Sequence, residues 1–375
     1  MLWLWVWLLE TEPLPMPLTV SVIIPVYNAA RYLQASLEHL RNLSPPPLEC
    51  IVVDDGSTDE SAAIARRAGA IVICAEARRG PAVARNLGAR AATGDILFFL
   101  DADVLVYPDA VSRVVSAFMA DPALDALIGS YDDAPGSASF VSQYRNLLHC
   151  FVHQNSRTET STFWTGCGAV RRQVFEAHSG FRETYWKPYL EDIEFGWRLT
   201  RAGRRIRLDR QLRVKHLKNW GIWETFTTDL LGRAVPWTHL ILRFRSMPAD
   251  LNLRWEHRLS VWLVCLLAAA AALEVGRGAI GVPLAPPWLW AAAVGGCATA
   301  VVLLNLGFYR FLAERKGWWF ALRTLPLHCL YFLSGGAGFA LGLLLYPLEA
   351  RRVTATEPQP SGEAGAYSRS SGSSK

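Results

Sequence analysis

Three clusters of polar side chains follow short apolar runs in the first 105 residues of the chain. They are Pro25-Val26-Tyr27-Asn28, Asp54-Asp55-Gly56-Ser57 and Asp101-Ala102-Asp103. If the apolar runs are parallel strands, their carboxyl ends meet at one sheet edge, where ligands bind in folds of this class. We therefore expect the three clusters to converge on one site.

Asp101 and Asp103 are the pair with the clearest chemistry. Two acids separated by one residue of extended chain point to the same face. Adjacent carboxylates repel one another, and a hard divalent cation with oxygen ligands, Mg²⁺ or Mn²⁺, relieves that repulsion. Such an ion also neutralises the charge that develops on a departing diphosphate. On local pattern alone, both acids could instead cap a helix beginning near Pro108.

The other two clusters offer groups suited to a nucleotide. The ring of Tyr27 could stack on a flat base, and the turn after Pro25 frees backbone groups to face a ligand. Asp55 could accept a hydrogen bond from a base N–H or a ribose hydroxyl, although acids in this position are as often turn or helix caps. Arg85 could reach a phosphate or a base, with an ordinary exposed arginine as the alternative.

Two further candidates lie near residues 190 and 216. Glu191 and Asp192 open a predicted helix, and a carboxylate at a helix N-terminus is stabilised as the anion, which suits a general base or a cap. His216 follows the basic, strand-like run Arg205–Val214, where a neutral imidazole could complete a metal shell. A lone histidine is more often structural.

The elements that must position these residues alternate between buried strands and helices. The predicted strands are Thr19–Val26, Cys50–Val53, Ala70–Cys74, Asp95–Leu100 and Ala126–Gly129. The predicted helices are Ala29–Asn42, Ser57–Ala68, Pro81–Ala92, Pro108–Ala120, Ala138–His153 and Leu190–Ala202. This alternation predicts an α/β fold with a mostly parallel sheet.

Five blocks in this order and spacing resemble the family 2 glycosyltransferases of the GT-A fold. They are VSVIIPVYN, VVDDGSTD, GPAVARNLGARAATGDILFFLDADV, TGCGAVRRQVFEAHSGF and EDIEFGWRL. The resemblance covers about residues 19–220 and implies inverting transfer of a sugar from a nucleotide diphospho-sugar. It further implies these roles: Pro25, Tyr27, Asp55, Arg85 and Asp101 at the donor; Asp101, Asp103 and His216 at the metal; Asp192 as catalytic base; and Thr165, Gly166, Cys167 and Glu191 on the acceptor side.

Two departures from the family's patterns narrow the activity. The chain lacks the QxxRW signature of processive synthases, so a single-transfer enzyme is favoured over a polymerase. Its acidic strand end reads DADVL rather than the DADLQ usual in dolichyl-phosphate mannose synthase-like enzymes, which disfavours a bare polyprenyl phosphate as acceptor. A polyprenyl-phosphate glycosyltransferase nevertheless stays as the alternative, and a membrane interaction protein with a degenerate transferase domain is the non-enzyme alternative.

The last third of the chain is apolar and predicts membrane attachment. After the amphipathic, aromatic stretch Trp220–Trp255 come three apolar runs, Leu259–Leu273, Leu284–Phe308 and Leu325–Tyr346. Between the second and third lie four basic residues, against Arg277 alone between the first two. The positive-inside rule therefore places the catalytic domain in the cytoplasm, with Arg351 and Arg352 as a minor contrary signal.

Composition completes the expected domain organisation and argues against a cysteine-bound metal site and a nucleic-acid-binding protein. Seven cysteines without a metal-binding spacing predict reduced thiols, and no basic run interleaved with aromatics indicates a nucleic-acid partner. The expected partners are a nucleotide-sugar, a lipid-linked or glycan acceptor and a membrane. The expected parts are an apolar, Pro-rich segment (1–18), the catalytic domain (19–220), an interfacial region (221–258), about three membrane helices (259–347) and a disordered tail (348–375). Met1–Leu9 could be a short segment that lies at the membrane interface, or it could be an overextended start of the sequence.

Overall fold

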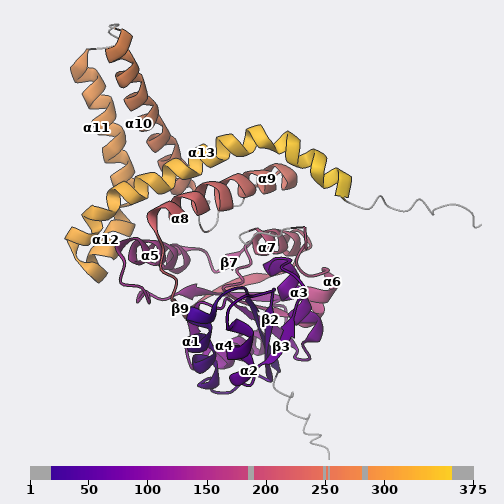
Figure 1. The fold of residues 1–375 in the computed structure, drawn as a ribbon. Coiled ribbons are helices and arrows are strands. Elements are labelled where there is room, and N and C mark those ends of the chain that lie inside the picture. The colour runs from indigo at the N-terminus through magenta and orange to yellow at the C-terminus, as the bar shows by residue number, and fades with distance from the viewer. Residues whose placement is uncertain (1–17, 185–189, 248–250, 252–253, 281–285, 357–375) are drawn as a thin grey trace, which may run out of the picture.

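The computed structural model describes residues 18–184, 190–247, 251, 254–280 and 286–356. The predictions about Met1–Leu9 and about the tail beyond residue 356 therefore lie outside the described residues. Residues 348–356, predicted as the start of a disordered tail, instead continue a helix that ends at Thr356. The described chain has two parts, an α/β domain and a set of long helices that lies against one side of it (Figure 1).

A nine-stranded sheet forms the centre of the first part, in the order β3-β2-β1-β4-β8-β6-β9-β5, with β7 paired to β9. Its strands are β1 (Val20–Val26), β2 (Glu49–Asp54), β3 (Ile71–Cys74), β4 (Ile96–Leu100), β5 (Val104–Val106), β6 (Ala126–Tyr131), β7 (Glu159–Thr160), β8 (Cys167–Arg171) and β9 (Ile206–His216). The first four in spatial order are parallel, as predicted. From β8 onward the sheet is mixed, because β8 runs antiparallel to both β4 and β6.

Helices cover both faces of this sheet, which explains why its strands are almost continuously apolar. The helices of this part are α1 (Ala30–Arg41), α2 (Ser61–Arg67), α3 (Pro81–Ala91), α4 (Ala110–Ala120), α5 (Phe140–Asn155), α6 (Arg172–Ala177) and α7 (Glu191–Arg201). Alternate residues of one strand enter different cores: Val22 and Ile24 pack with α1 and α4, whereas Ile23 packs with α3, α6 and α7. The α/β prediction is confirmed, with all five predicted strands and all six predicted helices present within a few residues.

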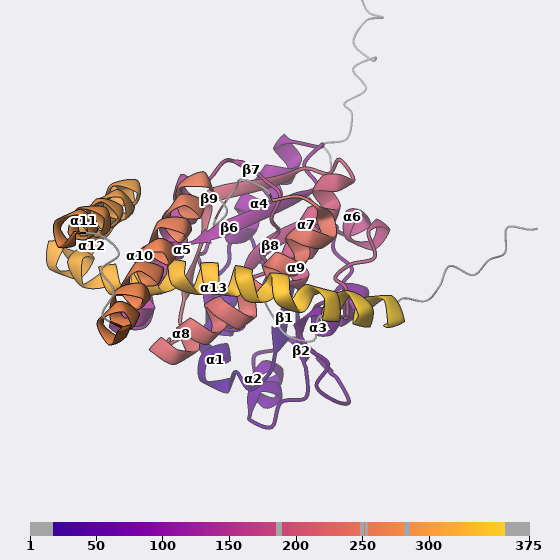
Figure 2. The ribbon, with the colours of Figure 1, turned by 90° about the horizontal axis from the view of Figure 1, so that it is seen from above.

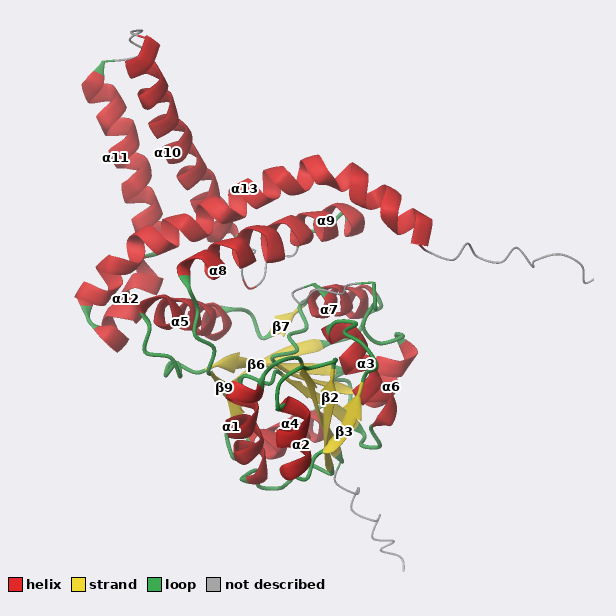
Figure 3. Ribbon diagram, viewed as in Figure 1, coloured by secondary structure: helices red, strands yellow, loops and turns green. Residues whose placement is uncertain are grey.

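Long helices make up the second part, where α8 and α9 lie between the α/β domain and α13 (Figures 1 and 3). The elements are α8 (Ile222–Thr227), the π-helical segment η1 (Thr228–Ala234), α9 (Val235–Phe244), α10 (Trp255–Ile280), α11 (Pro287–Leu304), α12 (Leu306–Lys316) and α13 (Trp318–Thr356). Seen from above, α13 crosses over the sheet and α9, while α10 and α11 lie together to one side (Figure 2). The helical part therefore covers one end of the sheet. We call η1 and α9, which line the cavity described below, the roof helices.

Among the described residues, two helices are long and apolar enough to cross a membrane, Trp255–Glu274 and Trp318–Leu348. The first predicted run is thus part of a longer helix that reaches Ile280. The second predicted run is occupied by α11 and the start of α12, two helices bent by 62°; if this pair counts as one broken span, the described residues hold up to three candidate spans. The bend falls at Asn305, whose amide donates to Ser260 Oγ on α10 at 2.8 Å and to the carbonyl of Val301.

The basic segment between the second and third apolar runs lies beside the α/β domain. Phe308 and Phe311 of α12 pack against Phe151 of α5, with ring centroids 5.3 and 5.5 Å apart. Arg315 of the same helix pairs with Asp133, which follows β6, at 2.6 Å. These contacts fix the end of the α11–α12 pair to the domain rather than leaving it to a flexible tether.

Two glycines of α13 let it approach the roof helices closely. A Cβ at Gly338 would lie 2.4 Å from Ala234 Cβ, and one at Gly342 would lie 2.6 Å from Thr238 Cβ. Such small residues four apart allow helix backbones to pack directly.

Gly338→Leu is therefore expected to lower the free energy of unfolding by about 1–3 kcal/mol, the usual effect of overpacking. Thermal unfolding of the detergent-solubilised chain measures this. Gly295→Leu on α11 is the matched control, because no atom lies within 4 Å of its Cβ position. Equal melting temperatures for the two variants would contradict the packing argument.

Candidate active site

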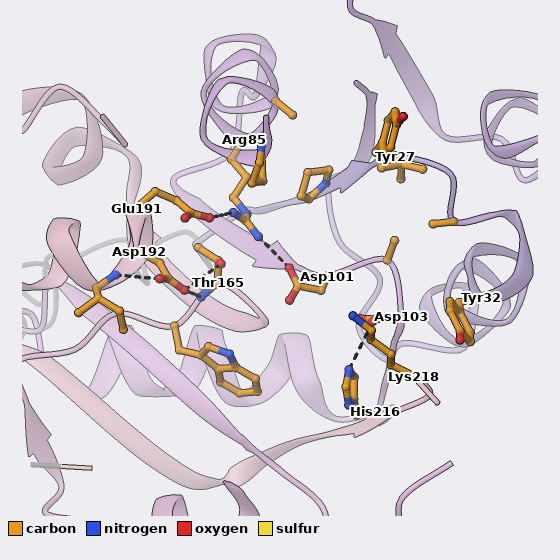
Figure 4. A pocket seen from close by; sticks show the side chains of 18 of the residues that line it. Tyr27, Tyr32, Arg85, Asp101, Asp103, Thr165, Glu191, Asp192, His216 and Lys218 are labelled. Carbon is orange, nitrogen blue, oxygen red and sulfur yellow. Dashed lines mark hydrogen bonds and ion pairs between the residues drawn. The ribbon is translucent and has the colours of Figure 1, made fainter. Parts of the chain in front are cut away.

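A cavity of 570 Å³ opens where β1 and β4 end and where η1 and α9 cover the sheet. It is lined by residues of all three sequence clusters and of the helical roof. In Figure 4, Asp101 lies between two groups, with Arg85, Glu191 and Asp192 on one side and Asp103 and His216 on the other. The predicted convergence is therefore present.

Asp103 and His216 meet because β5 pairs with β9. This short strand, which sequence patterns did not predict, sets Val104 opposite His216 in the antiparallel register. Asp103 Oδ2 then lies 3.3 Å from His216 Nε2. Burial raises the pKa of Asp103, but His216 in its protonated form, Lys218 and a backbone N–H together outweigh burial and hold the pKa below its usual value.

The other nitrogen of His216 is held from α5. Nδ1 lies 2.8 Å from the amide oxygen of Asn146, and an oxygen there requires Nδ1 to carry the proton. In the neutral imidazole, Nε2 then presents its lone pair to the Asp103 carboxylate. Two electron-pair donors facing one another suit a shared cation.

Asp101 is held by a buried arginine. Arg85 Nη2 donates to Asp101 Oδ1 at 2.8 Å, and Nη1 donates to Glu191 Oε1 at 2.6 Å. The Arg85 side chain is only 5% exposed, so the alternative of an ordinary exposed arginine is wrong. Burial raises the pKa of Asp101 more than Arg85 lowers it.

Glu191, the second acid bound by Arg85, also has a raised pKa. Burial raises it to about 7, even though the adjacent guanidinium opposes the shift. Because the folded-state value exceeds the ordinary 4.5, the folded state holds a proton that the unfolded state has lost between about pH 4.5 and 7. Stability from this group therefore falls as pH rises through that window.

Glu191→Gln should remove this pH dependence. Relative to the variant, the wild-type chain is expected to lose melting temperature between pH 5 and pH 7 and to change little above it. Thermal unfolding of both proteins across that range is the measurement. Parallel curves would show that Glu191 stays ionised in the fold throughout.

Asp192 is oriented by the loop before β8. Its Oδ2 accepts hydrogen bonds from the backbone N–H and hydroxyl of Thr165, both at 3.2 Å, and its Oδ1 accepts from Ile193 N at 2.8 Å. The side chain lines the cavity and is 8% exposed. A carboxylate fixed in this way can accept a proton from a group bound in the cavity.

The residues predicted to bind the donor nucleotide, Tyr27 and Asp55, lie at the opposite end of the cavity (Figure 4). Asp55 accepts from the N–H groups of Arg79 and Gly80, each at 2.8 Å, and so ties the loop before α3 to the end of β2. Gly56, at φ 78°, permits this approach, since a Cβ there would lie 3.1 Å from Arg78 N. Tyr27 is 39% exposed, with the Arg78 guanidinium 3.9 Å from the ring centroid. The ring therefore has one face covered.

Two predicted acceptor-side residues do not reach the cavity. Thr165 lines it, but neither Gly166 nor Cys167 is among its lining residues. Cys167 begins β8, pairs with Leu100 and is fully buried in the sheet, where burial raises the pKa of its thiol. Gly166 packs against the Trp164 ring, which a Cβ would meet at 2.5 Å. The acceptor-side prediction for Gly166 and Cys167 did not anticipate that a strand, β8, begins at Cys167.

Several lining residues were not predicted individually. They are Arg78, Tyr32, Tyr131, His149, His153, Trp164, Lys218, Trp220, Arg233 and Trp237. The spacing of His149 and His153, four apart on a predicted helix, and the basic, aromatic composition after Trp220 were the available signals. Among the described residues, no group of three or more His, Cys, Asp or Glu side chains could hold a metal ion by itself.

Comparisons with known proteins point to one family model and to several relatives. The family model described as glycosyl transferase family 2 matches residues 21–179. The uncharacterized glycosyltransferase YibD of Escherichia coli (strain K12) is 37% identical over 105 residues, which are 27% of this chain and 30% of that protein. Poly-beta-1,6-N-acetyl-D-glucosamine synthase of Staphylococcus aureus (strain COL) is 27% identical over 199 residues, 50% of this chain and 47% of that one.

The matches also include a solved structure. It is the mannosyltransferase PcManGT from Pyrobaculum calidifontis in complex with GDP-Man and Mn²⁺. The match covers 89% of this chain and 88% of that one, at 20% sequence identity and a TM-score of 0.47. The chain spans less than half the length of the curated relatives it matches. The ordered blocks, the sheet and the matched family model together support a family 2 glycosyltransferase domain in the α/β part of the chain.

Proposed function

We propose that the protein catalyses metal-dependent, inverting transfer of a sugar from a nucleotide diphospho-sugar to an acceptor hydroxyl. The observation that carries the proposal is the convergence of Asp101, Asp103 and Asp192 on one cavity, with Tyr27 and Asp55 at its other end. These groups would supply the separate functions of that reaction: nucleotide binding, metal binding and proton removal.

The proposed step is a single displacement. The Asp192 carboxylate takes the proton of the acceptor hydroxyl, and the oxygen attacks the anomeric carbon from the face opposite the diphosphate. The bond between that carbon and the diphosphate oxygen breaks, and its electron pair leaves with the nucleotide diphosphate. One base suffices, because charge stabilisation replaces the acid that a glycosidase uses.

Mg²⁺ or Mn²⁺ fits the donor set beside Asp103. A carboxylate oxygen and an imidazole lone pair face one another there, and both are ligands for such ions. Asp103 and His216 would hold the ion, with Asp101 beside them, and the remaining positions are left for diphosphate oxygens and water. When bound, the ion supplies electrostatic stabilisation of the leaving group.

Asp101 and Arg85 have a positioning part in this proposal. The Arg85 guanidinium holds Asp101 on one side and Glu191 on the other, so it links the donor strand to the helix that bears Asp192. Tyr27 offers its free ring face to a base, and Asp55 shapes the loop that would face the nucleotide.

The helical part suits an acceptor at a membrane surface. The roof that borders the cavity, η1 and α9, packs on α13, and α13 contains one of the two helices that could span a membrane. We propose a multi-pass membrane protein with a cytoplasmic active site and a lipid-linked or envelope glycoconjugate acceptor.

A panel of nucleotide-sugars tests the function without knowledge of the acceptor. The detergent-solubilised chain is expected to hydrolyse one or a few of them slowly, and only with Mg²⁺ or Mn²⁺. Treatment with EDTA should abolish hydrolysis and restored metal should recover it. Absence of both hydrolysis and donor-induced thermal stabilisation across uridine, guanosine, cytidine and thymidine diphospho-sugars would refute the proposal.

A further inference from the structure

On the side of the cavity formed by the roof helices lies a cationic side chain, that of Arg233, which has no part in the predicted donor or metal sites. Arg233 of η1 lines the cavity, and its side chain is 30% exposed. Its Nη1 lies 3.0 Å from His149 Nε2 and 3.7 Å from Asp229 Oδ1. Neither contact gives the guanidinium a close carboxylate partner.

The buried charges around Arg233 do not balance. Arg145 Nη1 takes the only close contact to Asp229 among the described residues, at 2.9 Å, so two arginines share one carboxylate. Burial lowers the pKa of Arg233 and also lowers that of His149 and of His153, so both imidazoles are neutral at pH 7. An excess positive charge in a partly desolvated setting is costly unless an anion pairs with it.

Unused ring nitrogens surround the same space. Within the described part of the chain, His153 Nδ1, Trp220 Nε1 and Trp237 Nε1 are buried without a hydrogen-bond partner. All three residues line the cavity, and His153 and Trp220 are each only 7% exposed. Buried polar groups in native proteins are normally paired, so these nitrogens indicate an absent ligand.

Ring contacts indicate that this end of the cavity lies between the Asp103–His216 pair and Asp192. Tyr131 stacks on His216 with centroids 4.8 Å apart and lies 6.0 Å from His149. Trp237 packs in the cluster that contains Ile193, the neighbour of Asp192. A group bound here would therefore extend from Asp192 toward the helical roof, away from Tyr27.

We propose that Arg233, His149, His153, Trp220 and Trp237 form a subsite for a phosphate group carried by the acceptor. This inference rests on the proposed function. A guanidinium and several N–H donors from different elements suit a tetrahedral, doubly charged anion with several oxygens. Leu251 and Trp237 add apolar lining on the roof side, which suits a phosphate borne on a lipid chain.

Thermal stabilisation of the full-length chain in detergent tests the subsite. The probes are farnesyl phosphate, farnesol and inorganic phosphate, each with and without saturating donor nucleotide. Farnesyl phosphate is expected to stabilise the wild type whether or not the nucleotide is present. Arg233→Gln should weaken its binding about tenfold or more, the scale of a charge-assisted hydrogen bond.

The matched control is Arg310→Gln, which removes an exposed cation of α12 outside the cavity and should bind the probe as the wild type does. Stabilisation by farnesyl phosphate beyond that by inorganic phosphate identifies a lipid-borne phosphate, and equal stabilisation identifies a free one. Stabilisation by farnesol alone, displacement by nucleotide, or equal binding by Arg233→Gln would overturn the subsite.

A second measurement covers the case in which Arg233→Gln does not fold. Phenylglyoxal modifies accessible arginines, and peptide mass spectrometry of the wild-type chain should show that farnesyl phosphate protects Arg233 but not Arg310. Unchanged modification of Arg233 would also overturn the proposal. Donor hydrolysis without phosphate binding would refute this subsite alone, whereas phosphate binding without any donor response would refute the proposed function.

Discussion

Asp103→Ala is expected to lower metal-dependent donor turnover by about 10²–10³-fold, the usual effect of removing one group that stabilises developing charge. The variant leaves His216 as a single ligand, so the metal concentration for half-maximal activity should rise as well. Initial rates over a Mn²⁺ titration, with a nucleotide-sugar that the wild type hydrolyses, measure both effects. Because Asp103 is partly open to the cavity and not part of a core, circular dichroism should stay that of the wild type.

Asp109→Ala is the matched control for this change. It removes the same charge six residues along the chain, where Asp109 pairs with Arg113 at the protein surface and does not line the site. We expect activity within about twofold of the wild type, since surface ion pairs contribute little. Near-wild-type turnover by Asp103→Ala, or an equal loss in both variants, would remove Asp103 from the metal site.

The half of the cavity that we propose for the donor could be predicted because it follows from local patterns. Each of β1, β2 and β4 is an apolar run that ends in polar residues, and parallel pairing alone brings those ends together. Asp101 and Asp103 could therefore be placed beside Tyr27 and Asp55 without any long-range information.

The rest of the site depends on pairings between distant segments. Asp103 meets His216 only through the β5–β9 register, and β5 has three residues, too few for a periodic signal. Cys167 was predicted wrongly for the same reason, because an antiparallel strand inserted beside β4 takes it into the sheet. Arg233 reaches the cavity only because the helical roof folds back over the domain.

For the apolar helices too, composition predicted where they occur but not how they are arranged in space. Apolar length predicted three runs, and helices occupy all three. The break between α11 and α12 was not predicted, because a buried hydrogen bond between Asn305 and Ser260 joins residues 45 positions apart. Asparagine in an apolar run gives no sequence signal of its partner.

Asp192→Asn should lower the rate of transfer by about 10²–10⁴-fold, the range for loss of a general base. Asparagine keeps the shape of the side chain and an oxygen that can accept the hydrogen bonds from Thr165, so the loss reports on proton removal rather than on folding. The donor KM should change little, because Asp192 lies on the acceptor side of the cavity. Steady-state transfer to the acceptor identified for the wild type measures both constants.

Two further comparisons separate a base from a structural carboxylate. Glu194→Gln alters a buried acid on the same helix that pairs with Arg182 and Arg198, so it should lower the melting temperature while the folded fraction keeps its turnover. Azide attacks without losing a proton, so it should form glycosyl azide at similar rates with the wild type and with Asp192→Asn. If azide reacts as slowly as the hydroxyl acceptor in the variant, Asp192 positions the substrates and a different group removes the proton.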